Sequence, residues 1–121
     1  MVFSRGGDQQ LRRVAEWRLG QIYLYLERFD DALAILGPED TTAFAPQFHD
    51  LRGDIYFAQG ELEDSRDEYQ LALVTDTAGV IDRNYVQMKL DDVSGSIAAL
   101  PASVKEVEVE EAAGEPAAVA E

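Results

Sequence analysis

Two stretches decide the fold: Gly20-Gln21-Ile22-Tyr23 and, 33 residues later, Gly53-Asp54-Ile55-Tyr56. The same shift of 33 carries Phe29 to Leu62, Asp31 to Asp64, Ala32 to Ser65 and Leu36 to Tyr69. A period of 33 to 34 residues is typical of helix-turn-helix repeats that stack into a solenoid. The alternative is two unrelated helical hairpins that match by chance, and the agreement in residue type at most of these positions argues against it.

Hydrophobic spacing predicts the helices of each repeat. Apolar residues recur three and four positions apart from Leu11 to Leu26, which predicts a long helix, and again over residues 46–59. Each is followed by a shorter helix: one after the Phe29-Asp30-Asp31 break, which offers an N-cap, and one from Leu62 to about Val74. Gly37-Pro38 and Gly60 end helices, and residues 78–92 are expected to form a fifth helix that caps the last repeat.

Eight residues are predicted to pack the repeats. Glycine in the middle of a helix costs about 1 kcal/mol relative to alanine, so Gly20 and Gly53 are expected where a paired helix approaches too closely for a side chain. Small and large partners then complete the contacts. The predicted packing residues are Gly20, Tyr23, Ala32, Leu36, Gly53, Tyr56, Ser65 and Tyr69.

The fold class is therefore all-α: a tetratricopeptide-type α-solenoid with two helix-turn-helix repeats, a C-terminal capping helix and a disordered acidic tail. We expect a disordered N-terminus at 1–9, a helical domain at 10–93 and the disordered tail at 94–121. No run approaches the roughly 20 apolar residues that span a bilayer, and Met1 to Gln10 lacks the layout of a signal peptide.

Charge excludes one class of partner. The formal charge is −14, of which residues 1–100, with nine basic and eighteen acidic side chains, carry −9. Such a field repels phosphate backbones, so we expect no nucleic-acid partner. The chain has no cysteine, which excludes disulfides and thiolate metal sites.

Several stretches resemble one specific family. Asp50-Leu51-Arg52-Gly53-Asp54, with Gly60, Arg66 and Gln87-Met88-Lys89-Leu90-Asp91-Asp92, are similar to the C-terminal part of the YfgM-type ancillary subunit of the Sec translocon. The resemblance covers roughly residues 10–94 and implies a periplasmic repeat domain that associates with SecYEG and a periplasmic chaperone at the bacterial inner membrane. Relative to that family pattern, the membrane anchor and first repeats are missing and the acidic tail is additional.

Solenoids of this kind bind peptides on the first helix of each pair. The positions free to contact a partner are Trp17, Gln21, Leu24, Tyr25, Asp50, Asp54 and Phe57. They predict an aromatic groove with an acidic rim, suited to an apolar or basic extended segment and not to a carboxylate clamp. Trp17 and Leu24 have a second reading as core positions, and self-association over the exposed N-terminal end remains an alternative.

No residue pattern indicates catalysis or a cofactor. His49 stands beside Asp50, but adjacent helical residues point in different directions, so no dyad is expected. The acid pairs Asp30-Asp31, Glu63-Asp64 and Asp91-Asp92 lack the spacing of a calcium loop, and no metal site is expected. The alternating Val104 to Glu110 could add to an open sheet edge, although a solvated extension is the ordinary reading. We predict a protein-interaction scaffold with a chaperone-like role, or alternatively a self-associating structural or regulatory module in the cytoplasm.

Overall fold

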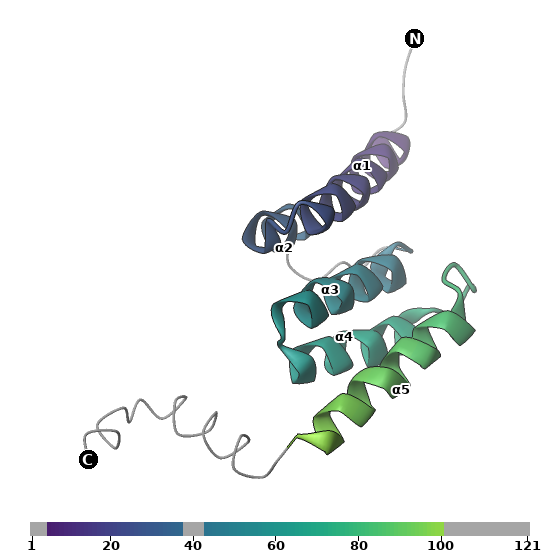
Figure 1. The fold of residues 1–121 in the computed structure, drawn as a ribbon. Coiled ribbons are helices and arrows are strands. Elements are labelled where there is room, and N and C mark those ends of the chain that lie inside the picture. The colour runs from purple at the N-terminus through teal and green to yellow at the C-terminus, as the bar shows by residue number, and fades with distance from the viewer. Residues whose placement is uncertain (1–4, 38–42, 101–121) are drawn as a thin grey trace.

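The chain folds into five α-helices, seen in a computed structural model that describes residues 5–37 and 43–100 (Figure 1). The helices are α1 (Arg5–Tyr25), α2 (Phe29–Leu36), α3 (Ala45–Gln59), α4 (Leu62–Thr75) and α5 (Arg83–Ala99). No strand occurs within these two ranges. The expected all-α class is confirmed.

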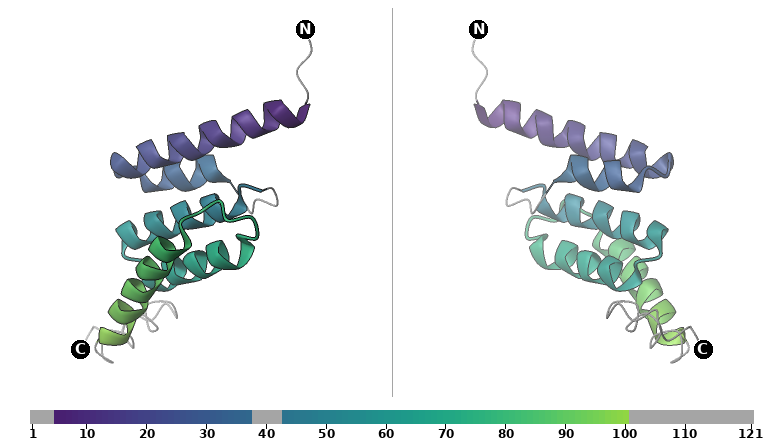
Figure 2. Two further views of the ribbon diagram at one scale, coloured as in Figure 1. Left: turned by 90° about the vertical axis from the view of Figure 1, so that its right-hand side faces the viewer. Right: turned by 90° about the vertical axis from the view of Figure 1, so that its left-hand side faces the viewer.

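The helices form a stack of hairpins. α1 pairs with α2 and α3 with α4, and the two pairs lie one upon the other, with α1 at one end of the stack (Figure 2). α5 packs against α4 at the opposite end and crosses the second pair obliquely (Figure 1). This is the expected arrangement of two helix-turn-helix repeats followed by a capping helix.

The turns that join the two helices of each pair differ in the residue that adopts a positive φ. Gly60 ends α3 with φ 83°, and the amide of Glu61 donates back to the carbonyl of Tyr56 at 2.9 Å, which is the expected glycine cap. The turn after α1 instead passes through Glu27 at φ 61°. α2 already begins at Phe29, so the expectation of an N-cap at Asp30 or Asp31 was wrong. Both acids lie in the first turn, where the helix dipole favours negative charge.

Two hydrophobic clusters form the core. The first joins both repeats and consists of Ala32, Leu36, Phe48, Leu51 and Ile55. The second joins α4 to α5 and consists of Tyr69, Ala72, Val86 and Val93. Because the first cluster joins the two helix pairs and the second joins the second pair to α5, the five helices form one continuous stack.

The two repeat glycines lie against large side chains. A Cβ built on Gly53 would stand 2.5 Å from Cε1 of Tyr69, and one on Gly20 would stand 3.1 Å from methyl carbons of Leu36 and Leu51. Ala32 and Ser65 are fully buried, and the Ser65 hydroxyl donates to the carbonyl oxygen of Gly53 at 2.8 Å.

The aromatic packing positions are buried unequally. Leu36 and Tyr69 are buried, whereas Tyr23 and Tyr56 are only half-buried. The glycines thus leave room for side chains of the second helix of a pair, with a much tighter fit at Gly53 than at Gly20.

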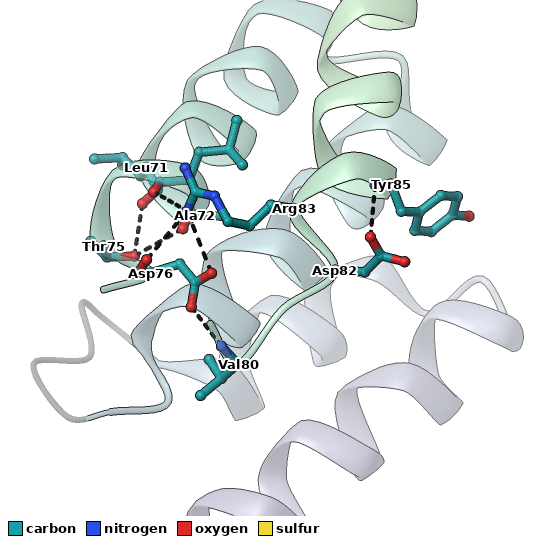
Figure 3. Close-up of polar contacts among 9 residues, drawn as sticks. Leu71, Ala72, Thr75, Asp76, Val80, Asp82, Arg83 and Tyr85 are labelled. Atoms are coloured by element: carbon teal, nitrogen blue, oxygen red, sulfur yellow. Dashed lines mark hydrogen bonds and ion pairs between the residues drawn. The ribbon is translucent and has the colours of Figure 1, made fainter. Parts of the chain in front are cut away.

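The start of the capping helix differs from the expectation of residues 78–92. Asp76 is buried and fixes the connection after α4 by accepting from the amide of Val80 at 2.7 Å and from the Arg83 guanidinium at 3.4 Å (Figure 3). Arg83 also donates to the carbonyl of Leu73 at 2.9 Å. Asp82 then caps α5 by accepting from the amide of Tyr85. Residues 78–82 therefore form a braced connection and not a helical turn.

Two valines of the capping helix are fully buried, and its other side is exposed. Val86 and Val93 face the core, while Val80, Tyr85 and Met88 are exposed. The same face continues with Leu90 and Ile97, both partly buried, and α5 extends past residue 94 to Ala99 despite Ser94 and Gly95.

The helices extend beyond the expected bounds of 10–93 at both ends, since α1 begins at Arg5 and α5 ends at Ala99. Residues 1–4 and the stretch from Pro101 to Glu121, including Val104 to Glu110, lie outside the described residues.

Substitution of the two glycines by alanine tests the packing. We expect Gly53→Ala to lower the free energy of unfolding by about 1–3 kcal/mol, because the new methyl group must displace a buried ring. Gly20→Ala is expected to be near neutral, since a gain of about 1 kcal/mol in helix propensity offsets small movements of flexible leucine ends. Urea unfolding followed by circular dichroism measures both. Equal effects would contradict the difference in fit.

Candidate functional site

The seven predicted binding residues divide into three groups in the structure. All seven lie on α1 and α3, the first helices of the two pairs. Trp17 and Leu24 are partly buried and pack against the first core cluster, which matches their second reading as core positions. Gln21, Tyr25 and Phe57 are exposed, Tyr25 by 86% and Phe57 by 50%. Asp50 and Asp54 form the third group, and both carboxylates are bound by another residue of the same chain.

Lys89 on α5 bridges the two carboxylates. Its Nζ atom lies 2.8 Å from Oδ1 of Asp50 and 3.0 Å from Oδ1 of Asp54. The same ammonium group stands 4.6 Å from the ring centroid of Tyr85 and 5.1 Å from that of Tyr69, within the range of cation–π attraction. The capping helix therefore already binds both carboxylates of the expected acidic rim and offsets one of their two negative charges.

Burial sets the ionisation of this cluster. Burial raises the pKa of the Asp50 carboxyl, and the hydrogen bond from Lys89 opposes that shift only in part. Burial alone would lower the pKa of Lys89, but the hydrogen bond to Asp50 and the negative charges of both aspartates raise it above its ordinary value. Burial, followed by the hydrogen bond that its hydroxyl donates to Asp54, raises the pKa of Tyr69 well above 10.0.

Sequence reasoning missed Lys89 and Arg52 as contact residues. Arg52 is buried, and its guanidinium donates to the carbonyl oxygens of Leu36 and Gly37 at the C-terminal end of α2. At this end the helix dipole favours a positive charge. The signal for Lys89 was the spacing of Asp50 and Asp54, which places two acids on one helix face. Two such acids need a cation once another helix covers them.

Four consecutive residues of α3 therefore contact the preceding helix pair, α4 and α5. Leu51 joins the first core cluster, Arg52 binds the end of α2, Gly53 receives Tyr69 of α4 and Asp54 contacts Lys89 of α5. Successive helical residues point about 100° apart, so four in a row face all sides of the helix. This helix is surrounded because it lies in the middle of the stack.

His49 contacts α4 and not Asp50. Its Nδ1 atom lies 2.8 Å from Oε1 of Glu68, and its side chain is almost wholly buried. Across residues 5–37 and 43–100, no group of three or more His, Cys, Asp or Glu side chains is placed to hold a metal ion. None of the helices in those ranges has the length and apolar character needed to cross a bilayer.

An open hollow lies at the turn between α1 and α2 and extends to the C-terminal end of α3. Tyr25 and Phe57 are at the C-terminal ends of α1 and α3, and the following turn residues line an open cavity of about 380 Å³. The lining residues are Glu27, Arg28, Phe29, Asp30, Asp31 and Gln59. Arg28 is paired with Asp31 at 2.6 Å, which leaves an excess of acid in this hollow.

Comparison with known proteins gives two matches. A sequence-family model, that of the tetratricopeptide repeat-like domain, matches residues 1–95 of the chain. The chain is also 33% identical over 92 residues to a protein of Neisseria gonorrhoeae named ancillary SecYEG translocon subunit, and this covers 76% of the chain but 44% of that relative. The chain thus spans less than half the length of the relative it matches. No solved structure matches the chain.

Removal of the bridging cation tests the cluster. We expect Lys89→Met to lower the free energy of unfolding by roughly 1–3 kcal/mol, because two partly buried carboxylates lose their partner. Asp50→Asn in the Lys89→Met background is expected to cost less than it does alone. A double-mutant cycle from urea unfolding measures this coupling. Additive effects would show that the bridge is absent in solution.

Titration at high pH tests the burial of Tyr69. The folded protein keeps the phenolic proton to a higher pH than the unfolded chain, whose ordinary pKa is 10.0. The resulting stability is complete below about pH 10 and falls above it by up to about 1.4 kcal/mol per pH unit. Tyr69→Phe removes this dependence, and it lowers stability at neutral pH by about 1–2 kcal/mol through the lost hydrogen bond. Unfolding free energies measured at several pH values should therefore converge for the two proteins as the pH rises above 10, and parallel curves would contradict the assignment.

Proposed function

Because the chain belongs to the tetratricopeptide repeat-like family, we propose that it is a protein-interaction scaffold that binds other polypeptides and catalyses no reaction. The observation that carries the proposal is the pair of exposed aromatic side chains, Tyr25 and Phe57, at corresponding ends of the two first helices. A folded chain gains by burying such rings, and rings left exposed on a solenoid provide contact area at low cost in side-chain entropy.

The chemistry of this surface favours an apolar or basic extended segment. The aromatic residues supply the apolar contact, and the acidic hollow at the turn between α1 and α2 attracts a lysine, an arginine or a terminal amine. Asp50 and Asp54 contribute to this surface only the one negative charge that remains, because Lys89 already binds both carboxylates. The binding surface of the proposal is thus Gln21, Tyr25 and Phe57.

We further propose that the partners belong to the protein-export apparatus. The support is the similarity to the ancillary SecYEG translocon subunit, together with the Leu-Arg-Gly-Asp and Gln-Met-Lys-Leu stretches of this chain. In this proposal the solenoid faces the periplasm at the inner membrane and holds emerging chains or a chaperone beside SecYEG.

Self-association is a second candidate function, and one specific observation favours it. Leu11, Ile22 and Leu26 are each more than half exposed on the outer side of α1. A helix at the end of a solenoid with an apolar outer side requires a cover.

Photocrosslinking tests the scaffold. A photoreactive phenylalanine analogue at position 57 or 25, introduced in cells that contain a Sec translocon, should capture translocon subunits or exported chains, as identified by mass spectrometry. The same analogue at Leu71, an exposed position on α4, is the matched control and should not capture them. Capture of the same proteins from the control position 71 would argue against a specific surface. Capture of the chain alone would favour self-association.

A further inference from the structure

One side of α1 carries an exposed stripe. Its residues follow a spacing of three and four, which keeps them on one helix face, and we call them the α1 stripe: Leu11, Ala15, Arg18, Ile22 and Leu26. Leu11 is 70% exposed and Ile22 54%. The stripe is apolar except for the arginine at its centre.

The repeat itself shows what such a stripe does when covered. A shift of 33 carries Leu11, Ala15, Arg18 and Ile22 to Phe44, Phe48, Leu51 and Ile55 of the second repeat. Phe48, Leu51 and Ile55 are buried in the cluster that joins α3 to the preceding pair. The α1 stripe is thus the corresponding face one repeat earlier, continuous with an interface that the fold already builds, but with a cation where α3 has a leucine.

Charge decides what kind of cover suits the stripe. Residues 1–28 contain five arginines and three acids, whereas residues 29–100 contain four basic and fifteen acidic side chains. A two-fold pairing of α1 with α1 would bring Arg18 beside Arg18, which like charges disfavour. The stripe suits a helix that offers apolar residues around a carboxylate.

The free face of α5 meets that requirement at the other end of the stack (Figure 2). Tyr85, Met88 and Asp92 are exposed at a spacing of three and four, and we call them the α5 stripe. The two cations of α5 are engaged elsewhere, Arg83 with Asp76 and Lys89 with the acids of α3. The exposed charge in the α5 stripe is therefore negative.

We propose that the α1 stripe of one copy packs antiparallel on the α5 stripe of a second copy, head to tail, with Arg18 paired to Asp92. This register places Ile22 opposite Met88 and Leu26 beside Tyr85, because Ile22 lies four residues after Arg18 and Met88 four before Asp92. The contact is heterologous, so each copy keeps one free end and chains of copies form. A single helix pair is a small interface, which makes the association weak and sensitive to salt.

The test is a charge exchange in the full 121-residue chain, with sedimentation velocity over a range of concentrations at low ionic strength. We expect an average mass that rises with concentration. Arg18→Glu and Asp92→Arg should each weaken the association about five- to tenfold, because attraction becomes repulsion. The double variant should regain it.

Arg12→Glu is the matched control. Arg12 is exposed on the same helix but lies off the stripe, so this variant has the same change in charge and should associate like the parent. Circular dichroism of each variant confirms that the fold is retained.

Three outcomes would overturn the proposal: a monomer at every concentration, reversals that leave the mass unchanged, or a double variant that does not recover. Stronger association of Arg18→Glu alone would point to α1 pairing with α1 and would equally overturn it. The inference deepens the self-association given as the second candidate. Because Phe57 lies on α3 and belongs to neither stripe, crosslinking at Phe57 tests the scaffold function separately.

Discussion

The absence of a side chain at Gly53 is the constraint on which the packing of the second repeat depends. The ring of Tyr69 occupies the space that a Cβ would need, and this close approach lets Ser65 reach the backbone of α3 and Tyr69 reach Asp54. The three residues around Gly53 then fix the other neighbours of α3. One helix thereby sets the positions of the preceding repeat, its own partner and the capping helix, so the order of the stack follows from a short segment.

The capping helix completes the fold both electrostatically and by apolar packing. Val86 and Val93 bury apolar surface against α4, and Lys89 supplies the cation that two acids of α3 require when they are covered. A buried charge without a partner is costly, so the ion pairs tie α5 to one register on α3 and α4. As a consequence, Asp50 and Asp54 are already bound within the fold, and the recognition surface that we propose is limited to the exposed aromatic residues and the hollow at the turn between α1 and α2.

The two ends of the stack differ in chemistry. The first helix contains four arginines and an exposed apolar stripe with Arg18 at its centre, while the exposed stripe of α5 contains Asp92. In a solenoid the middle repeats cover one another, and only the end helices present faces that resemble the covered interfaces. Opposite charges on opposite ends favour contacts between different ends over contacts between like ends.

The sequence by itself determined the number, order and pairing of the helices, because a period of 33 residues with glycine, isoleucine and tyrosine at matched positions is a local pattern that each repeat satisfies within its own residues. It also singled out Tyr25 and Phe57, which are exposed, but together with Trp17, which packs against the core. It did not determine where α5 begins, because Asp82 becomes an N-cap only when Asp76 and Arg83 brace the preceding connection. Only the tertiary structure decided that Asp50 and Asp54 bind Lys89, since charges 35 and 39 residues apart meet through the crossing angle of α5, and no local periodicity encodes that angle.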